Sequence, residues 1–210
     1  MPPARAPRKA RTSKLLVVDA SVMAAAGGEA ATDPTPAHAR DALKAILTIC
    51  HKVCLSPELS DEWKRHQSRF ARRWLTQMYA ARKVIVREPP ACHEILADIR
   101  AFHAITQAEF AAVEKDIHLI AAALVSDRAV LSWDHRVAIA IRKVCVDQTT
   151  VTSKSVSHVL WIDPIADRDA LYAWLSENGP ARASWQLGVT ALPATVTGRS
   201  GGRSTQRGRR

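Results

Sequence analysis

A run of four apolar residues that ends in a single acid places the strongest constraint on this chain. Leu15-Leu16-Val17-Val18 leads directly into Asp19. Continuous apolar runs of this length are typical of parallel strands that are buried on both faces. Open α/β sheets bind ligands at the carboxyl ends of their strands, which is where Asp19 would lie. The alternative is that Asp19 only caps the following helix, so a site requires further acids at the same edge.

Further strands and helices alternate along the rest of the chain. The first strand is predicted over 14–19, and short apolar runs predict others at 53–55, 84–86, 129–132 and 158–162. Helices are predicted from 35, over 57–82, over 91–103, from 106 to about 116, over 117–125, over 135–143 and over 167–177. Residues 24–31 are predicted to be a loose connection. This alternation predicts an α/β fold, a three-layer α/β/α sandwich with a mostly parallel central sheet.

The net charge of +10 lies in the two ends of the chain. Residues 1–14 and 199–210 each carry five basic residues and no acid, which leaves 20 basic and 20 acidic residues between them. We therefore predict a disordered basic arm over 1–13, one domain over 14–178 and a flexible basic tail over 179–210. Such tails are compatible with binding to a phosphate backbone, and equally with solvated arms that have no binding role.

The cysteines and the apolar segments indicate the cellular environment. The four cysteines include no CxxC pair and form no clear ligand set with the histidines, so free thiols in a reducing cytoplasm are expected. No apolar run approaches the ~20 residues of a membrane helix. The basic N-terminus is not followed by the apolar segment of a signal peptide. We expect a cytoplasmic protein with no membrane association.

Four acids fall at predicted element boundaries: Asp19, Glu62, Asp116 and Asp134. In a parallel sheet, the ends of the strands and the starts of the following helices share one edge, so these acids are expected to converge. Clustered carboxylates repel one another unless cations neutralise them. Because oxygen donors without Cys or His favour hard cations, the expected ion is Mg²⁺ or Mn²⁺.

The same stretches, in this order, resemble the PIN-domain family. The resemblance rests on Leu-Val-Val-Asp19-Ala-Ser21, Leu-Ser-Asp-Glu62-Trp, Lys-Asp116-Ile-His-Leu-Ile and Val-Leu-Ser132-Trp-Asp134, and covers about residues 14–165. It implies a metal-dependent ribonuclease in which the four acids surround Mg²⁺. It also implies Ser132 as a supporting hydroxyl and Ser21 as the small polar residue after the first acid. Glu58 and Asp61 lie near Glu62, which is preferred because it directly precedes a tryptophan.

The resemblance further implies an RNA substrate, the toxin role of a toxin–antitoxin pair with an antitoxin protein as partner, and a homodimer. Arg65, Arg69, Arg72 and Arg73 recur at helical spacing and predict a basic stripe that follows a phosphate backbone, with a solvated face as the alternative. The N-terminal arm and the region after 165 lie outside the resemblance.

Other functions leave fewer traces in the sequence. There is no GxxxxGK[ST] or GxSxG motif, and Ser21 stands where a haloacid-dehalogenase-type phosphotransferase needs a second Asp. His118 and His135 adjoin proposed ligands, although histidines at such positions are more often surface or packing residues. The six tryptophans are expected mostly in the core and do not indicate a base-stacking surface. The main alternative is a PIN-like module that binds RNA or protein without cleavage.

Overall fold

Five parallel strands form the centre of the computed structural model, which describes residues 12–28, 34–102, 105–146, 151–177 and 179–189. The strands are β1 (Leu15–Val18), β2 (Lys52–Leu55), β3 (Val84–Val86), β4 (Ala129–Leu131) and β5 (Leu160–Ile162). They pair in the order β3-β2-β1-β4-β5, and every pair is parallel. The strand order reverses between β1 and β4, which makes the carboxyl ends of these two strands the topological switch point of the sheet.

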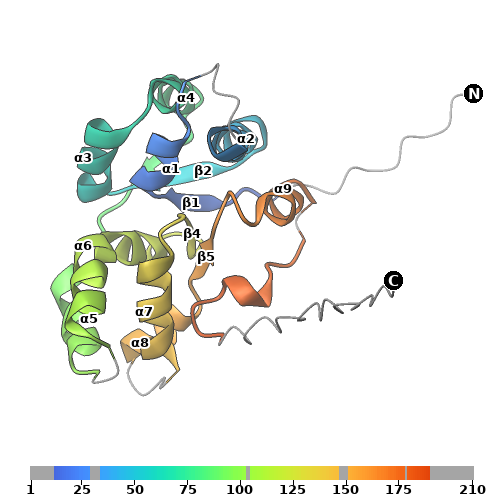
Figure 1. Ribbon diagram of the computed structural model, residues 1–210. Helices are drawn as coiled ribbons and strands as arrows, with labels where there is room; N and C mark the ends of the chain where they lie inside the picture. Colours follow the sequence, from blue (N-terminus) through green and yellow to red (C-terminus); the bar gives the residue numbers. More distant parts are fainter. Residues whose placement is uncertain (1–11, 29–33, 103–104, 147–150, 178, 190–210) are drawn as a thin grey trace, which may run out of the picture.

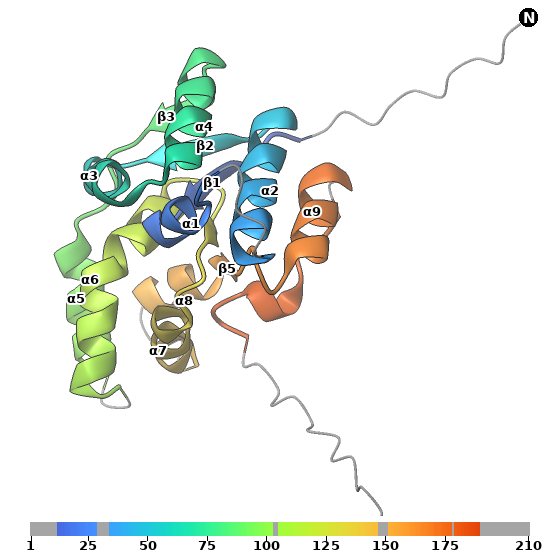
Figure 2. The same ribbon diagram turned by 45° about the horizontal axis from the view of Figure 1, so that its top comes forward.

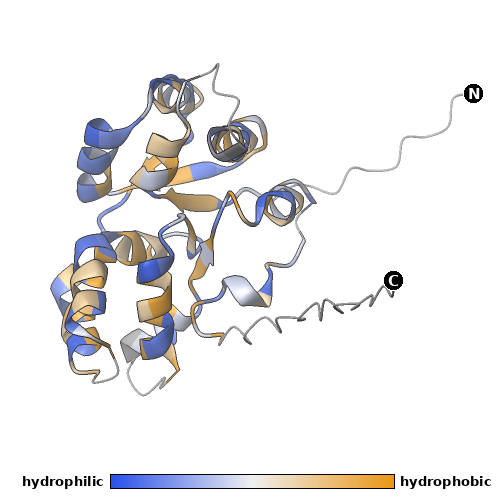
Figure 3. Ribbon diagram, viewed as in Figure 1, coloured by the Kyte–Doolittle hydropathy of each residue, from blue (hydrophilic) through white to orange (hydrophobic). Residues whose placement is uncertain are grey.

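The apolar run Leu15–Val18 forms β1, the central strand of the sheet. Leu16, Val17 and Val18 are fully buried, because β2 and β4 lie on either side of β1 and helices cover both faces. Strand β1 is correspondingly apolar in Figure 3, whereas the helices carry both hydrophilic and hydrophobic residues. A strand buried in this way has no need for alternating polar residues.

Helices cover both faces of the sheet, as Figures 1 and 2 show from two directions. The first group is α1 (Ala20–Ala25), α2 (Pro34–Thr48), α3 (Pro57–His66), α4 (Arg69–Ala80) and α9 (Arg168–Glu177). The second is α5 (Cys92–Arg100), α6 (Gln107–Leu124), α7 (His135–Cys145) and α8 (Val151–Ser157). α2 packs against α4 and α9, and α6 packs against α5 and α7. The arrangement is the predicted three-layer α/β/α sandwich, with a sheet that is parallel throughout.

Two helix predictions were wrong in opposite ways. The helix predicted over 57–82 is divided into α3 and α4, because Ser68 is extended and its hydroxyl accepts the N–H of Ala71 at 3.2 Å to cap α4. Conversely, the two helices predicted over 106–125 form the single helix α6. The capping box of Thr106 and Glu109 at its start is confirmed. Two short helices, α1 and α8, were not predicted.

The packed domain extends beyond the boundary predicted at 178. In the segment 179–189, Trp185 is 2% exposed and Leu187 is fully buried. The ring of Trp185 packs edge-on against Trp174 of α9 at 5.8 Å, and the N–H of Leu187 donates to the carbonyl of Val159 at 2.9 Å. Proline and glycine after α9 thus mark the end of that helix, not the end of the domain. Residues 1–11 of the arm predicted over 1–13 and the rest of the tail, 190–210, lie outside the described residues.

All four cysteines are free thiols, as expected. Cys54 and Cys145 are buried, and burial raises the pKa of each to about 11, which keeps them as unreactive thiols at neutral pH. Cys50 and Cys92 are half-buried. Among the helices of the described residues, none combines the length and the apolar character needed to cross a membrane.

Candidate functional site

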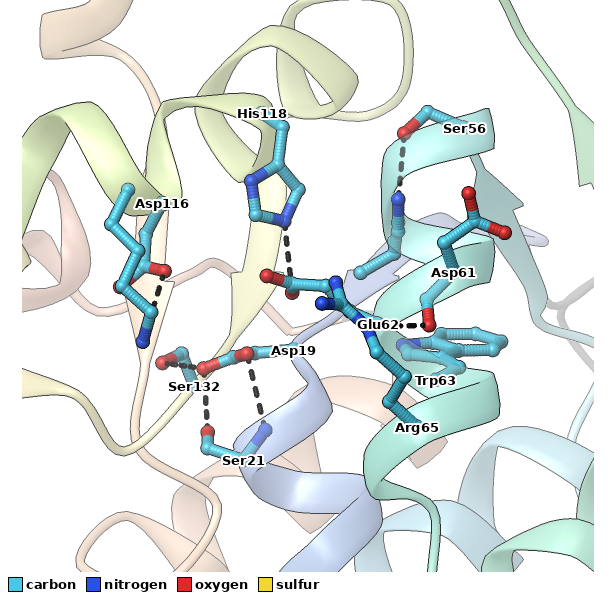
Figure 4. A network of polar contacts seen from close by, with 12 residues as sticks. Asp19, Ser21, Ser56, Asp61, Glu62, Trp63, Arg65, Asp116, His118 and Ser132 are labelled. Carbon is cyan, nitrogen blue, oxygen red and sulfur yellow. Dashed lines mark hydrogen bonds and ion pairs between the residues drawn. The ribbon is translucent and has the colours of Figure 1, made fainter.

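Asp19 is held at the carboxyl end of β1 by groups from β4, from the residue that follows β4 and from α1. Its main-chain N–H donates to the carbonyl of Leu131 in β4 at 2.9 Å. One carboxylate oxygen accepts the N–H of Ser21 at 3.1 Å, and the other accepts the hydroxyls of Ser21 at 2.5 Å and Ser132 at 2.6 Å (Figure 4). Asp19 therefore caps α1, as the alternative interpretation expected, and is also a carboxylate of fixed orientation at the switch point.

Ser132 connects two of the predicted acids. It is fully buried after β4, where its N–H donates to the carbonyl of Ile162 at 3.0 Å. Its hydroxyl donates to Asp19 and accepts the N–H of Asp134 at 3.0 Å. Asp134 then caps α7 by accepting the N–H of Arg136 at 2.9 Å. A single hydroxyl thus connects the acids that follow β1 and β4.

Asp116 reaches the same region from the middle of α6. It is 9% exposed, and burial raises the pKa of its carboxyl from 3.8 to about 6. Lys115, whose ammonium lies 3.8 Å from this carboxyl, lowers the pKa, whereas Asp19 and Asp134 raise it. All three carboxylates line the same pocket, so Asp19 and Asp134 act on the carboxyl of Asp116. The raised pKa also means that this acid lacks full compensation by cations of the protein.

Glu62 lies on α3, and two contacts determine where it points. The indole N–H of the next residue, Trp63, donates to the carbonyl of Val18 at 2.9 Å, which ties α3 to the end of β1. The carboxylate of Glu62 meets Nε2 of His118 at 3.1 Å, on the side of α6 that faces α3 (Figure 4). Asp61 instead pairs with the exposed Lys64 at 2.9 Å. Of the three acids in this region, Glu62 is the one that faces the other acids.

These acids line one pocket of about 530 Å³ at the carboxyl ends of β1 and β4. The pocket is open to solvent and has both acidic and basic groups in its wall. Its lining consists of Asp19, Ala20, Ser21, Ala24, Glu62, His66, Lys115, Asp116, Trp133, Asp134, His135 and Arg136. The four acids come from separate parts of the sequence, and they line the same pocket, as predicted. A larger groove, between α2 and α9, contains none of the predicted site residues.

The donors suit a hard cation, although they do not surround a common point. In the part of the chain that the structure describes, no group of three or more His, Cys, Asp or Glu side chains is arranged to hold a metal ion. Mg²⁺ keeps several of its waters and usually binds through one or two carboxylates together with substrate phosphates. The pocket provides such carboxylates. Direct binding of all four acids to one or two ions stays a prediction.

No family model, curated protein or solved structure matches this chain. Membership of the PIN family therefore stays a prediction that rests on the quoted residues and their positions.

Two histidines contribute more than the sequence indicated. His118 is 6% exposed and holds Glu62, although its position two residues after Asp116 was the only signal in the sequence. His135 lies in the pocket wall, with Nε2 3.0 Å from a carboxylate oxygen of Asp163. Asp163 was missed, although it directly follows the apolar strand β5, the same pattern that identified Asp19. It is 9% exposed and accepts the N–H groups of Ile165 and Ala166.

The predicted basic stripe is divided between two helices. Arg65 lies on α3, where its Nε donates to the carbonyl of Asp61 at 3.2 Å, whereas Arg69, Arg72 and Arg73 lie on α4. All four are exposed, but none is among the residues that line the acidic pocket. A single helical stripe beside the acids is thus wrong, because Ser68 interrupts the helix. Whether these arginines bind nucleic acid stays a prediction.

Proposed function

We propose that this chain is a metal-dependent nuclease of the PIN type that hydrolyses phosphodiester bonds of RNA. One observation carries the proposal: four acids, predicted from stretches more than a hundred residues apart, line a single pocket at the switch point of the sheet. The most direct use for a cluster of partly buried carboxylates in an open pocket is to bind a cation. Among hydrolytic sites, those that act on phosphates match this donor set best.

The residues of the chain would divide the work as follows. Asp19, Glu62, Asp116 and Asp134 would hold Mg²⁺ or Mn²⁺, which when bound supplies the Lewis acid that activates water and offsets charge on the phosphate. Ser132 orients Asp19 and, through the N–H of Asp134, keeps the two strand ends in place. Ordered outer partners of this kind keep ligand oxygens directed at the ion.

The cationic side chains of the pocket wall would bind the substrate backbone. Lys115 and Arg136 line the pocket beside the acids, and both are exposed. Cations at these positions would attract the phosphates that flank the scissile bond, while the ion neutralises the acids beneath. We propose a cytoplasmic location, an antitoxin partner and a homodimer as further properties, on the resemblance to the PIN family alone.

Cleavage of labelled RNA in Mg²⁺, Mn²⁺ or EDTA tests the proposal. Asp19→Asn and Glu62→Gln should each lower the cleavage rate by at least ~100-fold, which is more than the loss expected for an outer-shell partner. Asp61→Asn is the matched control, because Asp61 adjoins Glu62 in the same helix but pairs with Lys64 at the surface. Its rate should equal that of the wild type. Cleavage that survives EDTA, or that both site variants retain, would exclude this active site.

A binding module that does not cut is the second candidate. The observation in its favour is that no three acidic or histidine side chains in the described residues are arranged as a metal site. Such a module would bind RNA or a protein without any metal-dependent cleavage. Calorimetric titration of the wild type with Mn²⁺ separates the two functions before any substrate is chosen. Binding of Mn²⁺ would favour the nuclease, and its absence would favour the binding module.

A further inference from the structure

Trp133 differs from every other tryptophan of the chain in its exposure. It is 41% exposed, whereas Trp63, Trp74, Trp161, Trp174 and Trp185 are each 7% exposed or less. The tryptophans were expected mostly in the core, and this one is the exception. Large aromatic rings are seldom left in water without a reason, since their burial contributes strongly to stability.

The exposed ring of Trp133 lies in the wall of the acidic pocket. It stands between Ser132 and Asp134 and lines the same pocket as the four acids. Of the large apolar side chains that the described residues expose, Trp133 alone belongs to the wall of this pocket. The ring is thus placed next to the site at which a phosphodiester bond would be cut.

The backbone that carries this ring is fixed on both sides. Before it, the N–H of Ser132 donates to the carbonyl of Ile162 at 3.0 Å. After it, the N–H of Asp134 donates to the hydroxyl of Ser132 at 3.0 Å, and Asp134 caps α7. An aromatic ring on a fixed backbone has only two side-chain torsions left to order, so it binds a flat partner at low entropic cost.

We infer that Trp133 is a stacking surface for one base of the nucleic-acid strand, next to the scissile phosphate. This inference rests on the proposed function and adds a binding residue to it. Every nucleobase has a π-face, so the contact tolerates different sequences. A base is free to stack on a side chain only where it has left its own helix, so the contact selects unpaired nucleotides of RNA or DNA.

Tryptophan fluorescence tests the inference separately from cleavage. In the Glu62→Gln background with Mg²⁺, a single-stranded oligonucleotide should quench the emission of Trp133, because the other five tryptophans are buried. The quenching should vanish in Trp133→Phe, which keeps a ring for stacking. Single-stranded RNA and DNA should both quench, whereas the same RNA in a duplex should not. Equal quenching by the duplex, or quenching that persists in Trp133→Phe, would overturn the inference.

Affinity gives the second measurement. Fluorescence anisotropy of a labelled strand should show binding that is about 5- to 150-fold weaker in Trp133→Ala, while Trp133→Phe keeps most of the affinity. Tyr172→Ala is the matched control, because Tyr172 is 60% exposed on α9 and lies outside the acidic pocket. Unchanged affinity in a folded Trp133→Ala protein would refute the inference. If Trp133→Ala binds weakly but the wild type does not cleave, the stacking surface stands and the nuclease proposal fails.

Discussion

Replacement of Asp116 by Asn should stabilise the metal-free protein at neutral pH. Burial raises the pKa of this carboxyl from 3.8 to about 6, with Asp19 and Asp134 adding to the rise. Between these two pH values, the group is protonated in the folded chain and ionised in the unfolded chain. The stability that it contributes is therefore present below pH 3.8 and is lost as the pH rises through about 6.

The size of the effect follows from the same two values. A rise in pKa from 3.8 to about 6 corresponds to a loss of about 3 kcal/mol in the free energy of unfolding at neutral pH. Asn resembles the protonated acid in shape and carries no charge, so Asp116→Asn should recover up to this amount at about pH 7. The gain should shrink towards zero as the pH falls to about 4.

Urea unfolding in EDTA, repeated across this pH range, measures the effect. Asp169→Asn is the control, because the side chain of Asp169 is 96% exposed and its removal should change stability equally little at every pH. The reasoning is refuted if Asp116→Asn is less stable than the wild type at about pH 7, or if its gain does not depend on pH.

Addition of Mg²⁺ should reverse the order of the two proteins. A ligand that binds only the folded state adds about 4.1 kcal/mol at a free concentration about 1,000 times its dissociation constant, which exceeds the loss of about 3 kcal/mol. The wild type should gain this stability, and Asp116→Asn should gain much less. If Mg²⁺ and Mn²⁺ leave both unfolding curves unchanged, the acids do not form a metal site.

Three further substitutions test other parts of the structure. Ser132→Ala should destabilise by about 1–3 kcal/mol and slow cleavage about 10- to 100-fold, since Asp19 loses the hydroxyl at 2.6 Å; urea unfolding and RNA cleavage measure the two effects. His118→Ala should release Glu62 and weaken Mn²⁺ binding about 10- to 100-fold, as measured by calorimetry. Urea unfolding of the metal-free variant is the control for its folding. Gly188→Ala should destabilise by about 1–3 kcal/mol, since its new Cβ would lie 2.5 Å from a side-chain atom of α8; an unchanged unfolding midpoint would show that 179–189 does not pack there.

Much of the fold could be predicted from the sequence because a buried parallel strand has a local pattern, a short continuous run of apolar residues. The ends of β1 and β3 were predicted to within one residue, because short apolar runs that contain β-branched residues indicate buried strands. The capping box of Thr106 and Glu109 was also predicted correctly, because its two residues contact each other within one helical turn. The capping box is thus a local feature that the sequence alone predicts correctly.

The errors arise where distant contacts decide. The division between α3 and α4 combines the local cap of Ser68 with a distant contact, since the N–H of Ser68 donates to the carbonyl of Met23 at 3.1 Å, a partner that no local pattern reveals. The ordered segment that ends in Leu187 is similar, because its apolar residues fit a surface formed by β5 and α9. Its glycine and proline content predicted a tail, and packing outweighed that composition.

The acidic pocket shows the same division between local and distant information. The switch-point rule placed Asp19 and Asp134 at one edge because both follow strands, and that required no knowledge of side-chain contacts. The sequence favoured Glu62 over Asp61 only through the tryptophan that follows it, whereas the orientation of Glu62 depends on the indole of Trp63 reaching Val18, a contact between residues 45 positions apart. The role of His118 depends in turn on that orientation, since only Glu62 places a carboxylate opposite α6. A sequence thus predicts which edge of a sheet can act, whereas the orientation of each functional group requires the packing between layers.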